Sequence, residues 1–202
     1  MQFDLIKLKD VILYACSRCE PSRLGAIKLH KVLYFSDMLH YADVGAPLTG
    51  ATYRKRPMGP TCDQLLGTLN ELVRDGALQI REVEYFGYMK KEYIVAGRSH
   101  GESLSETARA VLDDVIEFVC VNNTAKTISE FSHNKAWEIA DFGDVITYNS
   151  VFNLFPTQVS PETMEWASQE AEAIAAERSK KDPVETRVFG TLREKILARL
   201  RA

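Results

Sequence analysis

Hydrophobic side chains recur at helical spacing along most of the chain. The pattern predicts an amphipathic helix over residues 4–19, a second over 24–42 and a third over 61–75. In the second segment the apolar positions cover more than one side of the helix. Because a helix with so much apolar circumference needs partners all round, we expect it to be the central, most buried element.

Two capping-box patterns predict further helices. Ser103 is followed three residues later by Glu106, and Thr127 by Glu130, which is the spacing that satisfies the free N–H groups of a first helical turn. The core positions predicted for these two helices are Leu104, Ala108, Val111, Leu112, Val115, Phe118, Val119, Ile128 and Phe131.

Strand signals are few. Glycine and proline punctuate residues 45–60 and leave room for one short extended piece over 51–56. Residues 78–85 and 88–95 are rich in β-branched and aromatic side chains, which predicts a β-hairpin. The predicted fold is therefore mainly α (α+β): a compact helical domain with a short strand and a β-hairpin, winged-helix-like in part.

The last part of the chain predicts C-terminal helices. Ser160 and Pro161 are a typical helix start, and residues 184–202 carry a single apolar stripe, formed by Val188, Leu192, Ile196 and Leu200. We expect a domain over residues 1–158 and a helical extension over 159–202. The stripe could dock on its own domain, on a second copy as a homo-oligomer, or on another protein.

Composition places the chain among ordinary globular proteins. Of its 202 residues, 46% are hydrophobic and 26% charged, and no apolar run approaches the roughly 20 residues that cross a bilayer. We expect a cytoplasmic protein without a membrane partner. The four cysteines are interpreted as reduced thiols. Cys16 and Cys19 form one C-x-x-C without a second pair, so no metal site and no cofactor are expected.

The distribution of charged residues bears on an alternative function, DNA binding. Residues 24–95 could form a winged helix, and the protein would then be a transcription regulator with 61–76 as recognition helix. Residues 1–60 carry nine Lys or Arg against five Asp or Glu, but residues 61–160 carry eight against fifteen. The proposed recognition helix has Asp63, Glu71 and Asp75 against one Arg, which phosphates would repel, so nucleic acid is not an expected partner.

No catalytic constellation stands out. His133 lies near Ser132 and Asp141, but neighbours in sequence seldom supply triad geometry, and the chain has neither a G-x-S-x-G elbow nor a phosphate-binding glycine loop. We expect no catalytic residues and no enzyme activity.

A composite motif resembles a known family. It combines K-L-x-K-x-L-Y-F, G-x-P-L-x-G and a closing G-P, with a weaker second segment, and its residues are Lys28, Leu29, Lys31, Leu33, Tyr34, Phe35, Asp37, His40, Gly45, Pro47, Leu48, Gly50, Gly59, Pro60, His133 and Trp137. This pattern resembles that of the Panacea domain, the SocA-like antitoxin family that also occurs in phage-associated proteins. The resemblance covers roughly residues 5–150.

The resemblance implies an antitoxin that neutralises a cognate toxin by direct contact. It further implies that the toxins of different members differ, and that members like SocA deliver their toxin to an AAA+ protease as proteolytic adaptors. It implies neither catalysis nor a cofactor.

Most motif residues are interpreted as architecture. The apolar and aromatic ones are core candidates, and Gly45 and Gly50, like Gly59, are expected where φ is positive or a side chain would collide. Lys28, Lys31 and Asp37 are expected to form a solvated ion-pair face.

Contact with a partner is expected from two exposed segments, besides the last helix. Tyr, Phe, Met and Arg are enriched in interface cores, and these types gather in both segments, although some could instead cover the core. The candidate partner-binding residues are Arg54, Lys55, Arg56 and Met58 in the Gly/Pro-rich loop, and Tyr85, Phe86, Tyr88, Met89 and Tyr93 in the hairpin.

Overall fold

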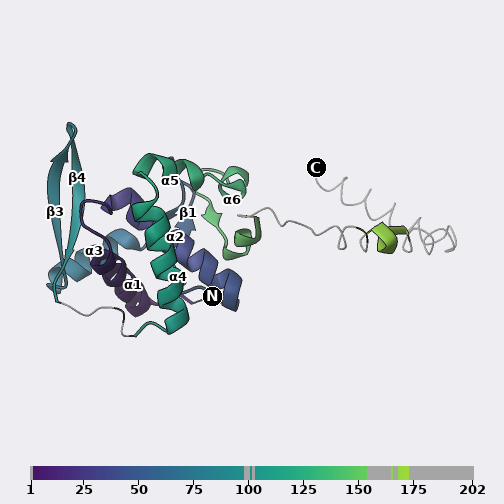
Figure 1. Cartoon of the computed structure of the whole chain (residues 1–202), viewed down its shortest axis with the longest axis horizontal. Coiled ribbons are helices and arrows are strands. Elements are labelled where there is room, and N and C mark those ends of the chain that lie inside the picture. The colour runs from purple at the N-terminus through teal and green to yellow at the C-terminus, as the bar shows by residue number, and fades with distance from the viewer. Residues whose placement is uncertain (1, 98–100, 102, 154–164, 166–167, 173–202) are drawn as a thin grey trace, which may run out of the picture. The chain divides into compact units, whose positions relative to one another are not determined.

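The computed structural model describes residues 2–97, 101, 103–153, 165 and 168–172 (Figure 1). The chain divides into two compact units, Met1–Pro156 and Thr157–Ala202. In the second unit, residues 165 and 168–172 are helical. The predicted helix start at Ser160 and the predicted helix over 184–202 lie outside the described residues. The account below concerns the first unit.

Helix α1 (Leu5–Arg18) follows the predicted amphipathic pattern. Asp4 caps it, because its carboxylate accepts a hydrogen bond of 3.0 Å from the Lys7 N–H. Its buried face packs against α2, α3, α4 and β4 through Leu8, Val11, Ile12, Tyr14, Ala15 and Cys16.

Helix α2 (Gly25–Val44) is the central element, as predicted. Every residue from Lys31 to Met38 is buried, and the helix contacts α1, α4, α5, β2 and β4. It ends at Gly45, whose φ of 73° is the left-handed conformation of a helix C-cap and whose N–H bonds to the Tyr41 carbonyl.

Three short antiparallel strands form one sheet in the order β2-β1-β5: β1 (Tyr53–Arg54), β2 (Thr61–Cys62) and β5 (Val145–Ile146). The predicted extended piece is thus confirmed as a strand. The predicted helix over 61–75 begins too early, since α3 spans Leu65–Arg74. Residues 61 and 62 pair with β1 instead, so strand pairing overrides the helical spacing there.

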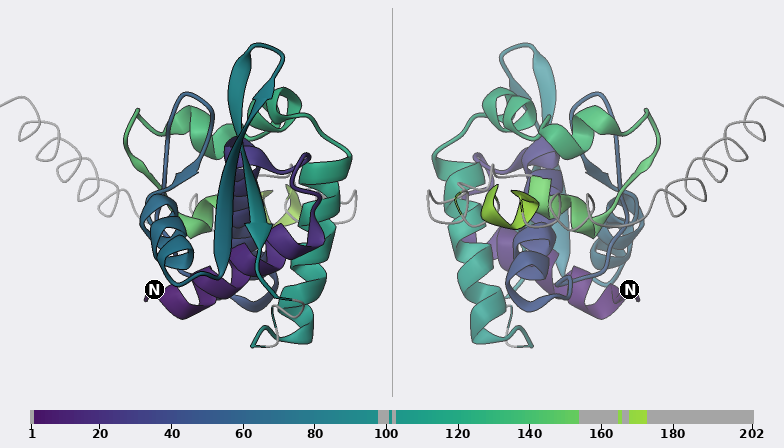
Figure 2. Two further views of the ribbon diagram at one scale, coloured as in Figure 1. Left: turned by 90° about the vertical axis from the view of Figure 1, so that its left-hand side faces the viewer. Right: turned by 90° about the vertical axis from the view of Figure 1, so that its right-hand side faces the viewer.

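The predicted hairpin is confirmed as β3 (Leu78–Tyr85) and β4 (Tyr88–Val95). Phe86 and Gly87 form its two-residue turn with φ values of 49° and 83°, the positive angles that suit the twist of a hairpin. The base of the hairpin packs on α1, α2 and α3, while the turn projects past the helices (Figure 2).

The remaining helices cover α2. Helix α4 (Glu106–Ile116) runs into a π-helical turn, η1 (Glu117–Val121), and α5 (Ala125–Phe131), α6 (Lys135–Ile139) and the 3-10 helix η2 (Tyr148–Asn153) follow. Both predicted capping boxes are wrong in position. Ser105 caps α4 and Thr124 caps α5, because each hydroxyl accepts a bond of 3.1 Å from the backbone N–H three residues on.

Two predicted core residues are exposed. Phe118 lies in the π-helical turn and Phe131 in the last turn of α5, with 37% and 48% of their surfaces accessible, whereas most other predicted core positions of these helices are buried. A π-helical turn holds more residues than an α-helical one, so it changes which side chains face inward. The mainly α fold with a short sheet and a hairpin is otherwise as predicted.

Candidate protein-binding site

Asp37 organises the centre of the motif. Its carboxylate is buried and accepts hydrogen bonds from the Thr49 N–H at 2.6 Å, the Thr49 hydroxyl at 2.5 Å and the Tyr53 hydroxyl at 2.6 Å, with the Tyr148 hydroxyl at 3.3 Å. Burial raises the pKa of Asp37, while these donors act in the opposite direction. The carboxylate thereby joins α2 to the 45–50 loop, to β1 and to η2.

Lys28 and Lys31 do not form the predicted solvated ion-pair face with Asp37. Both lysines are buried and bond to backbone oxygens: Lys28 Nζ donates to the Cys120 carbonyl at 3.1 Å and Lys31 Nζ to the Pro60 carbonyl at 3.0 Å. The prediction was wrong because spacing alone does not show that α2 is enclosed on every side. Burial lowers the pKa of Lys31 to about 7.

The pH dependence of stability should report the burial of Lys31. The unfolded chain keeps this proton up to the ordinary pKa of 10.5, whereas the folded chain gives it up above a pKa of about 7. The unfolded state binds more protons between these values, so the free energy of unfolding rises with pH there, by at most about 1.4 kcal/mol per pH unit. Relative to Lys31→Met, the wild type should gain up to about 2 kcal/mol between pH 7 and 9 in urea unfolding. Lys7→Met, at an exposed position, is the control; equal pH dependence of wild type and Lys31→Met would show that the Lys31 ammonium is hydrated.

A hydrogen bond from α5 fixes the loop between β1 and β2. Ser129 Oγ donates to the Met58 carbonyl at 2.9 Å, and Ser132 Oγ donates to the Ser129 carbonyl at 2.7 Å. Gly59 has φ 91° and lies so close to Ser132 and Lys31 that a Cβ would be 2.5 Å from Lys31 Nζ. Glycine is required here both for backbone conformation and for space.

The basic side chains of this loop mainly fix its shape. Arg54 Nε is 2.6 Å from Asp63 Oδ2. Lys55 is buried, donates to the Ala140 carbonyl at 3.0 Å and lies 4.0 Å from the Trp137 ring centroid. Of the four predicted contact residues in this loop, Arg56 and Met58 are the exposed ones.

An exposed apolar surface next to this loop was not predicted. Trp137 Nε1 donates to the Arg56 carbonyl at 3.1 Å, and the Trp137 ring stacks on His133 with centroids 3.9 Å apart. Phe142 lies 6.0 Å from Trp137, and both Phe142 and Ile139 are largely exposed. Residues 138–142 have no periodic pattern, so the sequence carried no signal beyond the apolar types themselves.

The other motif residues are structural, as expected. His40 Nδ1 donates to the Ala46 carbonyl at 2.8 Å. Gly50 has φ 70°, and a Cβ there would be 2.5 Å from the Gln2 carbonyl oxygen. Pro47 is partly buried. The buried apolar, aromatic and proline members are Leu29, Leu33, Tyr34, Phe35, Leu48 and Pro60.

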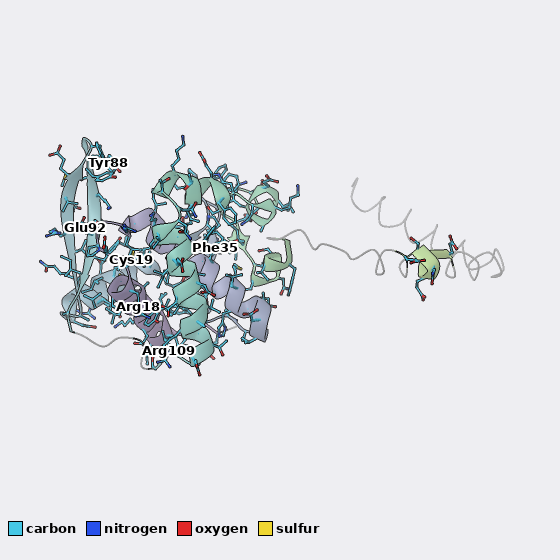
Figure 3. All side chains as sticks on the ribbon, in the orientation of Figure 1. Arg18, Cys19, Phe35, Tyr88, Glu92 and Arg109 are labelled. Carbon is cyan, nitrogen blue, oxygen red and sulfur yellow. The ribbon has the colours of Figure 1, made fainter. Side chains whose placement is uncertain are left out.

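The hairpin turn carries four large side chains away from the helices. Tyr85, Phe86, Tyr88 and Met89, here called the tip cluster, are 45%, 89%, 55% and 61% exposed. The rings of Phe86 and Tyr88 lie 4.7 and 5.5 Å from that of Tyr85. Figure 3 shows Tyr88 close to the turn, beyond Glu92. These four side chains do not cover the core. Tyr93, the fifth predicted contact residue of the hairpin, is buried in the core, so the alternative role holds for Tyr93 alone among the five.

The hairpin stem beneath the tip cluster is fixed by polar contacts. Arg81 Nη2 and Glu92 Oε2, which face each other across the strands, are 2.8 Å apart, and Glu92 is buried. Lys90 Nζ donates to the Ser22 carbonyl and lies 5.2 Å from the Tyr85 ring. The tip cluster is therefore presented on an ordered base.

No metal site or membrane span is found in the described part of the chain. No group of three His, Cys, Asp or Glu side chains there could hold a metal, and no described helix is long and apolar enough to cross a membrane. The four cysteines are free and buried, and burial raises the pKa of Cys16 and of Cys62 to about 12. His30 Nδ1 accepts from the Cys62 N–H at 3.2 Å, and burial lowers the pKa of His30 to about 4.

Comparison with known proteins gives one match. The family model "Antitoxin SocA-like, Panacea domain" matches residues 29–138. The matched segment runs from α2 into α6 and includes the hairpin, the buried lysine Lys31, and Asp37 with its partners Thr49 and Tyr53. Neither a curated protein nor a solved structure matches the chain.

Proposed function

Because this chain belongs to the antitoxin SocA-like, Panacea domain family, we propose that it neutralises a cognate toxin protein by binding it directly. The observation that carries this proposal is the tip cluster, four large apolar and aromatic side chains exposed on an ordered hairpin. Tyr and Phe are frequent anchors of protein interfaces, and an exposed apolar patch of this kind is typical of a binding surface.

The neighbouring loop supplies a second contact region. Arg56, Met58, Ile139 and Phe142 are exposed beside Trp137, and all belong to segments tied to one another by backbone hydrogen bonds. Arginine and methionine are interface-enriched types, and the backbone here is held in place before any partner arrives. Lys55 is buried, and its hydrogen bond to the Ala140 carbonyl joins the two segments of this region.

Delivery of the bound toxin to an AAA+ protease is a variant of the same function. It requires the same primary contact with the toxin and adds a second contact with the protease. Neutralisation by binding alone needs only the first contact, so the two variants share the surface proposed here.

A DNA-binding role has less support. Helix α3, the counterpart of the predicted recognition helix, presents Glu71 and Asp75, both of which bind Lys9 of α1 at 2.8 and 3.3 Å. Its exposed Leu66 and Val73 are apolar. Such a helix offers little to phosphates.

Truncating the tip cluster should weaken toxin binding and leave the fold intact. Phe86→Ala and Tyr88→Ala remove rings that make no core contact, so thermal unfolding should change little, while the dissociation constant for the toxin should rise by the equivalent of about 1 to 3 kcal/mol. Isothermal titration calorimetry with the protein encoded by the neighbouring gene provides the measurement.

The matched control is Leu66→Ala, which removes a side chain 66% exposed on α3, away from both contact regions. Its affinity should equal that of the wild type. Full affinity of the Phe86 and Tyr88 variants would remove the hairpin from the binding surface.

A further inference from the structure

A third apolar surface lies between α2, the end of α4 and α5. It is a groove of about 310 Å³, here called the Phe groove, lined by Phe35, Leu39, Asp114, Val115, Phe118 and Phe131. Figure 3 labels Phe35 beside α4. Five of the six lining side chains are apolar, and the sixth is a carboxylate.

Three phenylalanine rings form the floor and one wall of the groove. The Phe35 ring lies 6.4 Å from that of Phe118 and 5.8 Å from that of Phe131, and the latter two rings are 5.2 Å apart. Phe35 is buried, whereas Phe118 and Phe131 each expose more than a third of their surface. The groove therefore offers edges and faces of aromatic rings to an incoming apolar side chain.

The backbone places Phe118 by means of the π-helical turn. The Asn122 N–H bonds to the Glu117 carbonyl at 3.1 Å, which is the i to i+5 pattern of a π-helix. Such turns are uncommon and occur frequently at functional sites, because they redirect side chains that a regular helix would bury. Here the redirected ring borders the groove.

One carboxylate lines the groove, and two more lie one helical turn from lining residues. Asp114 lines it, Glu117 lies one turn further along the same helix, and Asp43 lies one turn beyond Leu39 on α2. All three carboxylates are exposed, and none of them forms an ion pair or a side-chain hydrogen bond within the described ranges. The segment 61–160, which contains α4 and α5, also has an excess of acidic residues, fifteen against eight basic ones.

We propose that the Phe groove binds an amphipathic helix of the toxin, with apolar side chains in the groove and Lys or Arg flanking them. This inference rests on the proposed function. The eight steps from Phe35 to Asp43 rise about 12 Å along α2, enough to meet two turns of a partner helix. Helix-in-groove binding uses apolar anchors at i, i+3, i+4 and i+7, and flanking bases would match the three carboxylates.

Two synthetic peptides test the chemistry without the toxin. Each is a helix of about 18 residues with Leu at i, i+3, i+4 and i+7. The remaining positions hold Ala and Lys in the first peptide, and Ala and Glu in the second. Fluorescence anisotropy with the full chain should show the Lys peptide binding at least about tenfold more tightly than the Glu peptide. Raising salt from about 50 to 300 mM should weaken the Lys peptide's binding.

Variants of the groove locate the binding. The double variant Phe118→Asp, Phe131→Asp should bind the Lys peptide at least about tenfold more weakly than the wild type. The double variant Asp114→Asn, Glu117→Gln should bind it about threefold more weakly, and its affinity should depend less on salt. Leu66→Asp on α3 is the matched control and should bind like the wild type. The carboxylate variant changes only exposed side chains, so it keeps the test decisive even when the double Asp variant fails to fold.

Four results would overturn the proposal. One is equal Lys-peptide affinity in the wild type and in both groove variants. Another is preference for the Glu peptide. The third is wild-type self-association, seen by sedimentation, that Phe118→Asp abolishes, since the occupant would then be a second copy. If the peptides fail but the full chain still rescues cells from its toxin, the groove proposal falls and the antitoxin function stands.

Discussion

Asp37→Ala should lower the free energy of unfolding by about 3 to 5 kcal/mol, a large part of the roughly 5 to 15 kcal/mol that a domain has. The substitution leaves the Thr49 N–H, the Thr49 hydroxyl and the Tyr53 hydroxyl buried without their acceptor. Each unsatisfied buried donor costs about 1 to 3 kcal/mol, and water entering the new space recovers a part of this. Urea unfolding followed by circular dichroism measures the loss.

Asp43→Ala is the matched control, because Asp43 lies on the same helix and is exposed. Its effect should stay within about 0.5 kcal/mol. Tyr53→Phe removes a single donor and leaves the carboxylate three, from Thr49 and Tyr148, so we expect a loss of about 1 to 2 kcal/mol. An Asp37→Ala variant as stable as Asp43→Ala would mean that this network does not hold the sheet and the 45–50 loop to α2.

Gly59→Ala should lower the free energy of unfolding by about 2 to 5 kcal/mol. A left-handed backbone at φ 91° costs an alanine about 1 to 2 kcal/mol, and the collision of its Cβ with Ser132 and Lys31 adds about 1 to 3 kcal/mol. Relief of the collision requires the Ser132 hydroxyl and the Lys31 ammonium to move, which strains their hydrogen bonds to the Ser129 and Pro60 carbonyls. Urea unfolding gives the stability.

Gly67→Ala is the corresponding control. Gly67 lies within α3, and nothing is within 4 Å of a Cβ placed there. Alanine should stabilise the helix by about 0.5 to 1 kcal/mol. Combining Gly59→Ala with Ser132→Ala should recover part of the loss, since one colliding atom is removed. Equal stability of Gly59→Ala and wild type would contradict the close approach of α2, α5 and this loop.

Most elements could be predicted from local patterns. The hairpin bounds follow from the alternation around Phe86 and Gly87, and the end of α2 follows from Gly45. The start of α3 could not be predicted, because residues 61 and 62 pair with β1 and this pairing leaves no mark on the helical spacing of 61–75. Helix caps were misplaced by two or three residues because Ser103 and Ser105, like Thr124 and Thr127, are neighbouring side chains able to cap.

Site residues were predictable where exposure follows from position at a turn. The tip cluster meets this condition. Its four large side chains lie in or next to a two-residue turn, at the far end of the hairpin, and cannot all reach the core. The burial of Lys31 and Lys55 was not predictable, because lysine is usually exposed and the enclosing segments, 129–132 and 137–142, lie far along the chain. Phe118 was assigned to the core because its spacing fits an α-helix and the π-helical turn leaves no sequence signal.

Buried motif residues and exposed surface residues have different roles in the domain. Motif residues such as Asp37, Lys31 and Gly59 are buried and maintain the scaffold, whereas the exposed tip cluster lies outside the motif and the Phe groove shares only Phe35 with it. A scaffold of this kind allows the exposed side chains to change without loss of the fold.

Co-expression with the neighbouring gene tests the central claim most directly. The toxin alone should stop growth, and the full chain should restore growth and co-purify with the toxin as a complex, whereas the double variant Phe86→Ala, Tyr88→Ala should rescue less well at equal protein level. Growth arrest that persists despite soluble wild-type protein, with no complex between the two, would contradict neutralisation by direct contact.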